Sequence, residues 1–226
     1  MNLTSHIKSH TNTEDSQQHK IRVIAFDYGK VSGVLFHDGK QRAVDKLKKE
    51  HGYDGDIIWK LMTSPESWDL RRGNICSNDF WKWAQEQLPK GYDSQLICDT
   101  WCNEYIMDKD ILDLLRRLKG HNYRIISYTD GIPERVEYLE NKYHFRHYFD
   151  AEVQSSDWQA VKTDEAFAQA LLKTAECETD PDALLLIDDQ EDEVQHVKKL
   201  GANVILYKTG FLNELVNALR NIGIQC

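Results

Sequence analysis

Four short apolar segments recur along the chain, and three of them end in polar residues. They span residues 21–26, 123–126, 183–187 and 203–207. Uninterrupted apolar runs of this length are typical of strands that are buried on both faces. Amphipathic stretches of helical length accompany them, at residues 109–119, 133–143, 164–175 and 191–200. This alternation predicts an α/β fold of three layers, in which helices cover both faces of a Rossmann-like parallel sheet.

A long segment after the first apolar run carries a helical pattern instead. It contains amphipathic stretches at residues 43–51, 56–62, 64–70, 77–87 and 92–105. We therefore predict a helical cap domain over residues 43–107, inserted into a core domain made of residues 20–42 and 108–226. Five of the six tryptophans lie in the insert, and we expect them mainly in its own core, with one or two lining a pocket. The polar, unpatterned residues 1–19 predict a flexible tail.

Polar residues follow three of the predicted strands at the point where each strand ends. Asp27 follows the first strand, Ser127 ends the second, and Asp188 and Asp189 follow the third. Because ligands of open parallel sheets bind beyond the carboxyl ends of the strands, these side chains are expected to meet at one edge. The sequence thus predicts a functional site there.

The composition of the chain limits the classes of partner that it is expected to bind. The formal net charge of −9 argues against binding to nucleic acid or an anionic membrane, because such surfaces are basic. No apolar run approaches the roughly 20 residues that a membrane-spanning helix needs. The five cysteines form no zinc-binding pattern and include no CxxC, so we expect reduced thiols in a cytoplasmic protein. We expect a monomer or homodimer.

Four ordered motifs carry a family resemblance. They are Phe26-Asp27-Tyr28-Gly29-Lys30-Val31, Ser127 at the end of its strand, Lys162 before a helix, and Asp188-Asp189 with Asp192. In this order they resemble the haloacid dehalogenase-like (HAD) hydrolases that have a helical cap after the first strand. The stretch Arg72-Gly73-Asn74-Ile75 is similar to caps of the branch that contains sugar-phosphate phosphatases and epoxide-hydrolase-linked phosphatases.

The resemblance implies roles for the residues that would meet the substrate. Asp27 would be a nucleophile that forms a covalent aspartyl intermediate. Ser127 would donate its hydroxyl to phosphate oxygens, together with the backbone N–H of Tyr128. Lys162 would neutralise charge in the transition state and restrain Asp27. The substrate would be a small phosphorylated metabolite, with sugar phosphates among the candidates.

The same resemblance implies a magnesium site. Asp188 would hold Mg²⁺ together with Asp27 and the backbone carbonyl of Gly29, since this hard cation prefers oxygen ligands. Asp189 and Asp192 would complete its inner or outer shell. For Asp192, a helix N-terminal charge favoured by the helix dipole is an equal alternative.

Gly29 departs from the pattern of phosphatases in this superfamily, which carry a general acid at that position. Such an acid contributes typically 10²–10⁴-fold to the rate. Three readings stay open. The first is a phosphatase that acts without this acid, with Lys30, His37 or a cap residue as a substitute proton donor. The second is a haloacid dehalogenase-type enzyme, whose halide leaves without a proton, and the third is a weak or inactive HAD-like module that binds a ligand or protein. Two cap arginines, Arg71 and Arg72, are candidates for binding a distal anionic group.

Overall fold

A six-stranded sheet forms the centre of the molecule. The computed structural model describes residues 5–6, 21–28, 34–37 and 39–226. In spatial order the strands are β1 (Ser5–His6), β8 (Asn203–Leu206), β7 (Leu184–Asp188), β2 (Val23–Asp27), β5 (Arg124–Thr129) and β6 (Ala151–Gln154). The five strands from β8 to β6 run parallel, and β1 pairs antiparallel with β8. The parallel sheet confirms the predicted fold class.

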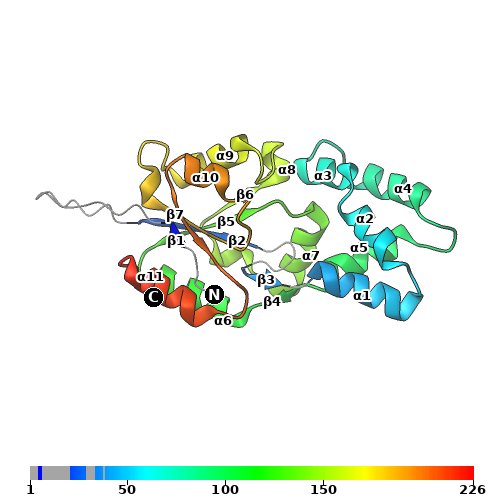
Figure 1. The fold of residues 1–226 in the computed structure, drawn as a ribbon, viewed down its shortest axis with the longest axis horizontal. Helices are drawn as coiled ribbons and strands as arrows, with labels where there is room; N and C mark the ends of the chain where they lie inside the picture. Colours follow the sequence, from blue (N-terminus) through cyan, green and yellow to red (C-terminus); the bar gives the residue numbers. More distant parts are fainter. Residues whose placement is uncertain (1–4, 7–20, 29–33, 38) are drawn as a thin grey trace, which may run out of the picture.

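Helices cover both faces of this sheet (Figure 1). One face carries α9 (Glu165–Ala175) and α10 (Gln195–Lys199), and the other carries α6 (Lys109–Gly120), α7 (Pro133–Tyr143) and α11 (Leu212–Asn221). Alternate residues of β2 enter the two cores: Ile24 and Phe26 pack on the α6 side, and Val23 and Ala25 pack on the α9 side. Because successive side chains of a strand point to opposite faces, Asp27 emerges on the α9 side.

Five further helices lie together to one side of the sheet (Figure 1). They are α1 (Gly39–His51), α2 (Gly55–Met62), α3 (Pro65–Arg72), α4 (Ser77–Gln87) and α5 (Ser94–Asn103). Their extents agree with the five helical stretches of the predicted cap, whose domain boundaries stay a prediction. Trp101 is fully buried in this group and meets Trp81 edge-on at 6.4 Å. Trp59, Trp68 and Trp83 are partly buried.

The remaining elements are short, and the hydrophobic pattern did not predict them. They are β3 (Phe36–His37) and β4 (Ile106–Met107), which pair antiparallel where the chain leaves and re-enters the core, the helix α8 (Ser155–Trp158), and the 3₁₀ helices Arg146–Tyr148 and Pro181–Ala183. Elements of two to four residues are too short to show a period. The strand β6 and the helix α11 were also missed.

Two expectations need correction. Residues 5–6 form the edge strand β1 and so are not part of a flexible tail, while the rest of that predicted tail lies outside the described residues. The last predicted helix, 191–200, is shorter than expected: it begins at Gln195, after a turn. No helix in the described part of the chain has the length and apolar character needed to cross a membrane.

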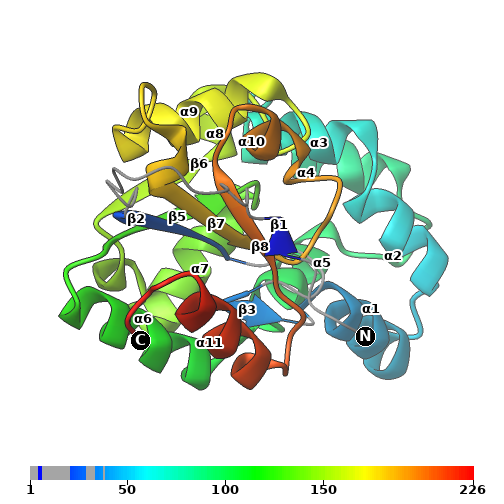
Figure 2. The same ribbon diagram turned by 60° about the vertical axis from the view of Figure 1, so that its left-hand side comes forward.

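In the turned view of Figure 2, the five-helix group lies beside the sheet. The carboxyl ends of β2, β5 and β7 lie at one edge of the sheet, because these strands are parallel neighbours. Asp27 and Asp188 lie at this edge.

Candidate active site

Two of the predicted site residues stand at the ends of adjacent strands. Asp27 is the last residue of β2 and pairs in register with Tyr128 of β5. Asp188 is the last residue of β7 and follows Ile187, the register partner of Phe26. Strand register therefore brings the Asp27 and Asp188 carboxylates to the same level of the sheet, on the same face.

Lys162 joins these carboxylates from the loop between α8 and α9. Its Nζ atom lies 2.5 Å from Asp27 Oδ1 and 2.7 Å from Asp188 Oδ2, and it lies 3.4 Å from Glu193 Oε2. All four side chains are buried, with exposed fractions of 3% or less. We call Asp27, Lys162, Asp188 and Glu193 the site cluster. It contains one ammonium group, that of Lys162, and three carboxyl groups.

Burial and this excess of carboxylates shape the ionisation of the cluster. Burial raises the pKa of the Asp27 carboxyl well above its ordinary value, although the nearby Lys162 ammonium opposes the shift. Burial acts to lower the pKa of Lys162, but Asp188, Asp27 and Glu193 outweigh it and hold that pKa well above the ordinary value. Lys162 therefore stays charged at neutral pH, and a further cation would favour the ionised form of Asp27.

Two carboxylates of the cluster and the neighbouring Asp189 form a donor set that fits a magnesium ion. Carboxylate oxygens of Asp27, Asp188 and Asp189 all lie within 4.8 Å of one another. Asp27 Oδ2 is buried and has no hydrogen-bond partner among the described residues, although Oδ1 contacts Lys162. Carboxylate oxygens are the protein ligands that Mg²⁺ prefers. The predicted backbone ligand, Gly29, lies outside the described residues.

At the end of β5, the residues lie in a different arrangement relative to Asp27 from the one that the sequence predicted. Ser127 is fully buried and pairs with Phe26, one position before the level of Asp27. Tyr128, at the level of Asp27, stacks its ring on Phe167 at 4.6 Å, and Lys162 Nζ lies 5.5 Å from that ring.

Thr129 lies closer to the strand end than Ser127 does. It is the last residue of β5, and its Oγ1 accepts a hydrogen bond of 3.1 Å from the backbone N–H of Gly131. Sequence reasoning missed this residue because the apolar run stops at Ile126, whereas the strand continues through Thr129. The glycine two residues later was the available signal, since it marks a turn at the site edge.

Asp192 is not brought into the cluster. It is exposed in the turn before α10, whereas its neighbour Glu193 is buried and faces Lys162. The late start of α10 decides this, because residues 191–194 do not follow the helical spacing that was assumed. Val194 and Val197 mark the buried side of this segment, and Glu193 adjoins that side.

Arg71 and Arg72 differ sharply in burial although they are neighbours in α3. Arg71 is 2% exposed; its Nη1 donates to the carbonyl oxygen of Asp130 at 3.1 Å, and its guanidinium lies 4.9 Å from the ring centre of Trp68. Burial lowers the pKa of Arg71, and Asp130 opposes that shift. Arg72 is partly exposed, and its Nε donates to Asp164 Oδ2 at 3.2 Å.

Of the two named substitutes for the absent acid, only His37 lies within the described residues. His37 belongs to β3, and its Nε2 lies 4.0 Å from Asp108 Oδ2. Lys30 lies outside the described residues.

Comparisons with known proteins agree with this fold. No family model matches the chain. An uncharacterised protein of Dictyostelium discoideum is 31% identical over 228 residues, which cover 89% of this chain and 97% of that protein. A HAD family enzyme of Bacteroides thetaiotaomicron, solved with magnesium and inorganic phosphate, is similar with a TM-score of 0.70 and 21% identity, covering 84% of this chain and 96% of its own.

Two further solved structures extend the comparison. A HAD-like family hydrolase of Porphyromonas gingivalis has a TM-score of 0.70 at 20% identity, over 91% of this chain and 99% of its own. The L-2-haloacid dehalogenase of Xanthobacter autotrophicus, with chloropropionic acid covalently bound, has a TM-score of 0.61 at 18% identity, over 91% and 85%. The chain therefore belongs to one family with the Dictyostelium protein, and its fold is that of the HAD hydrolases.

Proposed function

We propose that this chain is a Mg²⁺-dependent hydrolase of small phosphomonoesters, with Asp27 as its nucleophile. The observation that carries the proposal is the contact of Lys162 with both Asp27 and Asp188, next to Asp189, at the carboxyl edge of the sheet. Support also comes from the Bacteroides enzyme of the same fold, which was solved with magnesium and inorganic phosphate. The net charge of −9 favours a small phosphorylated metabolite over nucleic acid as the partner.

The reaction would run in two displacements. A carboxylate oxygen of Asp27 attacks phosphorus, a new O–P bond forms, and the bond from phosphorus to the leaving oxygen breaks. Water then attacks the aspartyl phosphate, which releases inorganic phosphate and restores the carboxylate. Lys162 holds Asp27 Oδ1 in place and offsets negative charge on the transferring group. Thr129 and Ser127 are the hydroxyl candidates for contacts with its oxygens.

Asp27, Asp188 and Asp189 are the residues that would hold the metal ion. When bound, Mg²⁺ supplies the positive charge that allows several carboxylates and a phosphate dianion to lie together. The site cluster by itself has only one ammonium against three carboxylates. Without the metal ion, the excess negative charge of the carboxylates would repel a dianionic substrate.

The glycine at position 29 limits the leaving group. It offers no side chain to protonate the departing oxygen, and general acid assistance is typically worth 10²–10⁴-fold. Acyl phosphates and anomeric sugar phosphates need less protonation of the leaving oxygen, because the hydroxyl groups that they release are more acidic than those of ordinary alcohols. We therefore expect the best turnover with such substrates.

A hydrolysis assay with a matched variant tests this proposal. Release of phosphate from acetyl phosphate and from hexose 1-phosphates is measured with Mg²⁺, with EDTA, and with Asp27→Asn. EDTA is expected to abolish activity, and Asp27→Asn to lower kcat by at least about 10³-fold, because the nucleophile is lost. Asp192→Asn, in the exposed turn, serves as the control and is expected to keep full activity. Turnover that survives EDTA or Asp27→Asn would contradict the proposal.

The same protein preparation separates the alternatives. Halide release from 2-chloropropionate in the presence of EDTA would instead favour the dehalogenase. Absence of turnover with every substrate, together with thermal stabilisation by Mg²⁺ and inorganic phosphate, would favour a binding module. The surplus of carboxylates in the site cluster favours the metal-dependent reaction over carbon–halogen hydrolysis, for which a further cation is not needed.

A further inference from the structure

A short segment of the core, residues 130–135, contacts three separate parts of the five-helix group. It runs from the end of β5 into the first turn of α7, and we call it the contact segment. Its partners belong to α3, to α4 and to the chain just after α5. The hydrogen bonds run from Arg71 Nη1 to the carbonyl oxygen of Asp130 at 3.1 Å, from Trp81 Nε1 to Glu134 Oε1 at 3.0 Å, and from Arg135 Nη1 to the hydroxyl of Tyr105 at 2.6 Å.

The contact segment directly follows a strand end at the candidate active site. Thr129, the last residue of β5, precedes the segment, and its neighbour Tyr128 pairs in register with Asp27. The Thr129 hydroxyl accepts a hydrogen bond of 3.1 Å from the backbone N–H of Gly131, which belongs to the segment. Because the oxygen accepts in this bond, the direction of its own O–H depends on where Gly131 lies. The position of the segment therefore orients the Thr129 hydroxyl.

The contact segment also acts on the site cluster through its charge. Burial acts to lower the pKa of Lys162, and Asp130 is among the carboxylates that outweigh this effect. Burial lowers the pKa of Arg71, while Asp130 and then Glu193 of the site cluster oppose that shift. Since Coulomb interactions weaken with distance, these effects indicate that α3, the segment and the cluster adjoin one another.

Two buried guanidinium groups hold the contact segment in place. Arg71 and Arg135 are each 2% exposed. At Gly131, a Cβ atom would lie only 2.5 Å from Arg135 Nη2, so this guanidinium lies directly against the backbone of the segment. A buried charge is costly unless its hydrogen bonds are well formed, and a planar guanidinium has donors in fixed directions. The two side chains therefore favour one arrangement of the segment while the five-helix group is in place.

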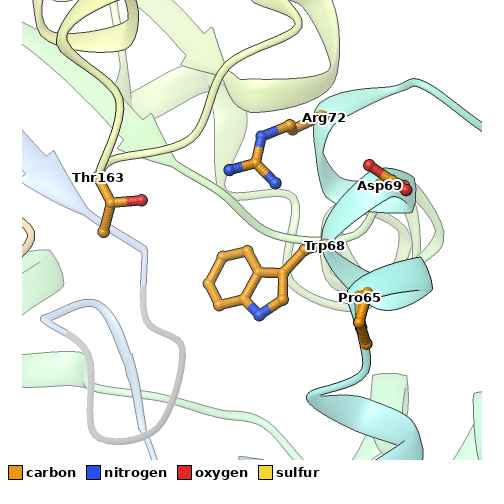
Figure 3. A pocket seen from close by; sticks show the side chains of 5 residues that line it. All are labelled: Pro65, Trp68, Asp69, Arg72 and Thr163. Carbon is orange, nitrogen blue, oxygen red and sulfur yellow. The ribbon is translucent and has the colours of Figure 1, made fainter.

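The neighbouring residue of α3, Arg72, contacts a different part of the core. Figure 3 shows its side chain and that of Trp68 extending from α3 towards the loop of Thr163. Its Nε donates to Asp164 Oδ2 at 3.2 Å, and both side chains of this pair are partly exposed. Of these two arginines, Arg71 is therefore the one that links α3 to the end of β5.

We propose that the contact segment transmits the position of the five-helix group to the active site by orienting Thr129, and that Arg71 is its main positioning residue. The inference rests on the proposed phosphatase activity, for which Thr129 is a hydroxyl candidate. With Arg71 on the Asp130 carbonyl, the Thr129 hydroxyl is held in the direction of the transferring phosphoryl group. Without Arg71 the segment relaxes, and the phosphoryl oxygens lose this donor. Arg71 thus acts through the segment and not as a ligand of the substrate.

Inhibition by inorganic phosphate tests the role of Arg71 during hydrolysis of acetyl phosphate with Mg²⁺. Arg71→Met is expected to raise the Ki of phosphate and the KM of acetyl phosphate about tenfold, because a hydrogen bond to a charged oxygen is weakened. Arg71→Lys keeps a donor for the Asp130 carbonyl and is expected to recover most of the loss. Partial unfolding of a variant would lower the apparent kcat but would leave Ki and KM unchanged.

The magnesium requirement provides an internal control for the same variants. Asp27, Asp188 and Asp189 lie outside the contact segment, so Arg71→Met is expected to change the Mg²⁺ concentration for half-maximal activity by less than about twofold. A rise in this concentration as large as the rise in Ki would mean that the substitution disturbs the whole site. The assignment of Arg71 to the Thr129 side would then be wrong.

Two tyrosine variants test a second contact of the segment with less disturbance of the fold. Tyr105→Phe removes the oxygen that accepts from Arg135 and is expected to raise the Ki of phosphate about threefold. Tyr53→Phe is the matched control, since Tyr53 is also buried but its hydroxyl accepts from the backbone N–H of Asp93 within the five-helix group. It is expected to leave Ki unchanged. Equal Ki values for Tyr105→Phe and Tyr53→Phe would contradict the proposal.

A double-mutant cycle tests whether the effect of Arg71 passes through Thr129. In a Thr129→Val background, Arg71→Met should raise Ki by no more than about twofold, because the donor that it orients is already absent. Lys142→Met breaks the contact of α7 with Asn103, which lies outside the contact segment, and should leave Ki unchanged in either background. Equal effects of Arg71→Met with and without the Thr129 hydroxyl would overturn the proposal.

A binding measurement separates this inference from the proposed function. Calorimetric titration of inorganic phosphate in the presence of Mg²⁺ needs no turnover, and Arg71→Met is expected to raise the Kd about tenfold. If the wild type hydrolyses no phosphate ester but this change in Kd is observed, the proposed function fails and the role of the contact segment stands. If the wild type is active and Arg71→Met leaves Kd unchanged, the role of the segment alone is wrong. If the wild type neither hydrolyses phosphate esters nor binds phosphate, both are wrong.

Discussion

The site cluster and the ion pair of Arg72 with Asp164 at the end of α3 place charged groups in opposite ways. In the cluster, Asp27, Lys162 and Asp188 are almost fully buried, and their contacts measure 2.5 and 2.7 Å. In the ion pair, Arg72 and Asp164 are 28% and 36% exposed, and their contact measures 3.2 Å. Water screens partly exposed pairs, which contribute little to stability, whereas a buried charge is costly unless a partner compensates it.

The buried contacts fit the role proposed for Asp27. A nucleophile must be held in one geometry, and the contacts of Lys162 with Asp27 and Asp188 do so. The comparison predicts that equivalent substitutions will have large effects in the first region and small effects in the second.

Lys162→Met should produce the largest change. It removes the ammonium from among three buried carboxylates, so we expect a loss of about 3–5 kcal/mol in the free energy of unfolding. Denaturant unfolding at pH 7 measures this value. Mg²⁺ should stabilise the variant, because the ion would replace part of the missing positive charge.

A surface lysine provides the control for this substitution. Lys142 is exposed and donates to the carbonyl oxygen of Asn103 at 3.0 Å. Lys142→Met should change the free energy of unfolding by less than about 1 kcal/mol. Similar losses in the two variants would show that the buried Lys162 contributes no more to stability than an exposed lysine does.

Arg71 and Arg72 allow the same contrast to be made between adjacent residues. Arg71→Met removes a buried hydrogen bond to Asp130 and leaves its carboxylate, 4.0 Å away, without this cation. We expect a loss of about 2–3 kcal/mol in the free energy of unfolding. Arg72→Met breaks only the half-exposed contact with Asp164, for which less than about 1 kcal/mol is expected.

Equilibrium unfolding of both variants under one set of conditions gives the comparison. The side chains are alike in size and stand one residue apart in α3, so helix propensity cancels. Equal losses in the free energy of unfolding would mean that the exposed Arg72 stabilises the end of α3 as much as the buried Arg71 does. Burial would then not explain how α3 is attached to the core.

Much of the core could be predicted from sequence because buried parallel strands leave an unambiguous pattern. The apolar run before Asp27 and the run before Asp188 both became strands within two residues of the predicted bounds. Their polar ends then had to meet at one edge, since parallel neighbours end on the same side. The approach of Lys162 to Asp27, 135 positions away in the chain, was predicted only through the resemblance.

Glu193 and Thr129 were not among the predicted site residues, and the two omissions have a common physical origin. Glu193 was overlooked because the pattern does not reveal the turn before α10, where a shift of one residue exchanges a buried side chain for an exposed one. Ser127 was chosen over Thr129 because hydrophobicity ends at Ile126 although the backbone pairing of β5 continues. Hydrophobic pattern reports burial, whereas the last residues of a strand are defined by hydrogen bonds to neighbours that the pattern does not identify.

The smallest expected effect concerns Asp150, a carboxylate near the opposite end of β5. Its Oδ2 accepts from the backbone N–H of Ile125 at 2.8 Å, and Lys119 Nζ lies 2.8 Å from Oδ1. Partial burial opposes ionisation of Asp150, but the Ile125 and Lys119 contacts outweigh it and lower the pKa of this carboxyl. Asp150→Asn should cost about 0.5–1 kcal/mol at pH 7, a modest value because solvent screens this largely exposed group.

The sign of the pH dependence follows from the direction of that shift. A carboxyl whose pKa is lower in the folded state contributes stability above its unfolded pKa of about 3.9, and this contribution disappears as pH falls through the folded value. The difference in unfolding free energy between wild type and Asp150→Asn should therefore be constant from pH 7 to 5 and shrink below about pH 4. Denaturant unfolding at stepped pH values measures it. A difference in unfolding free energy that grows on acidification would mean that the Ile125 and Lys119 contacts do not favour the ionised carboxylate. Exposed ion pairs of this protein would then contribute even less to its stability than the about 0.5–1 kcal/mol expected here.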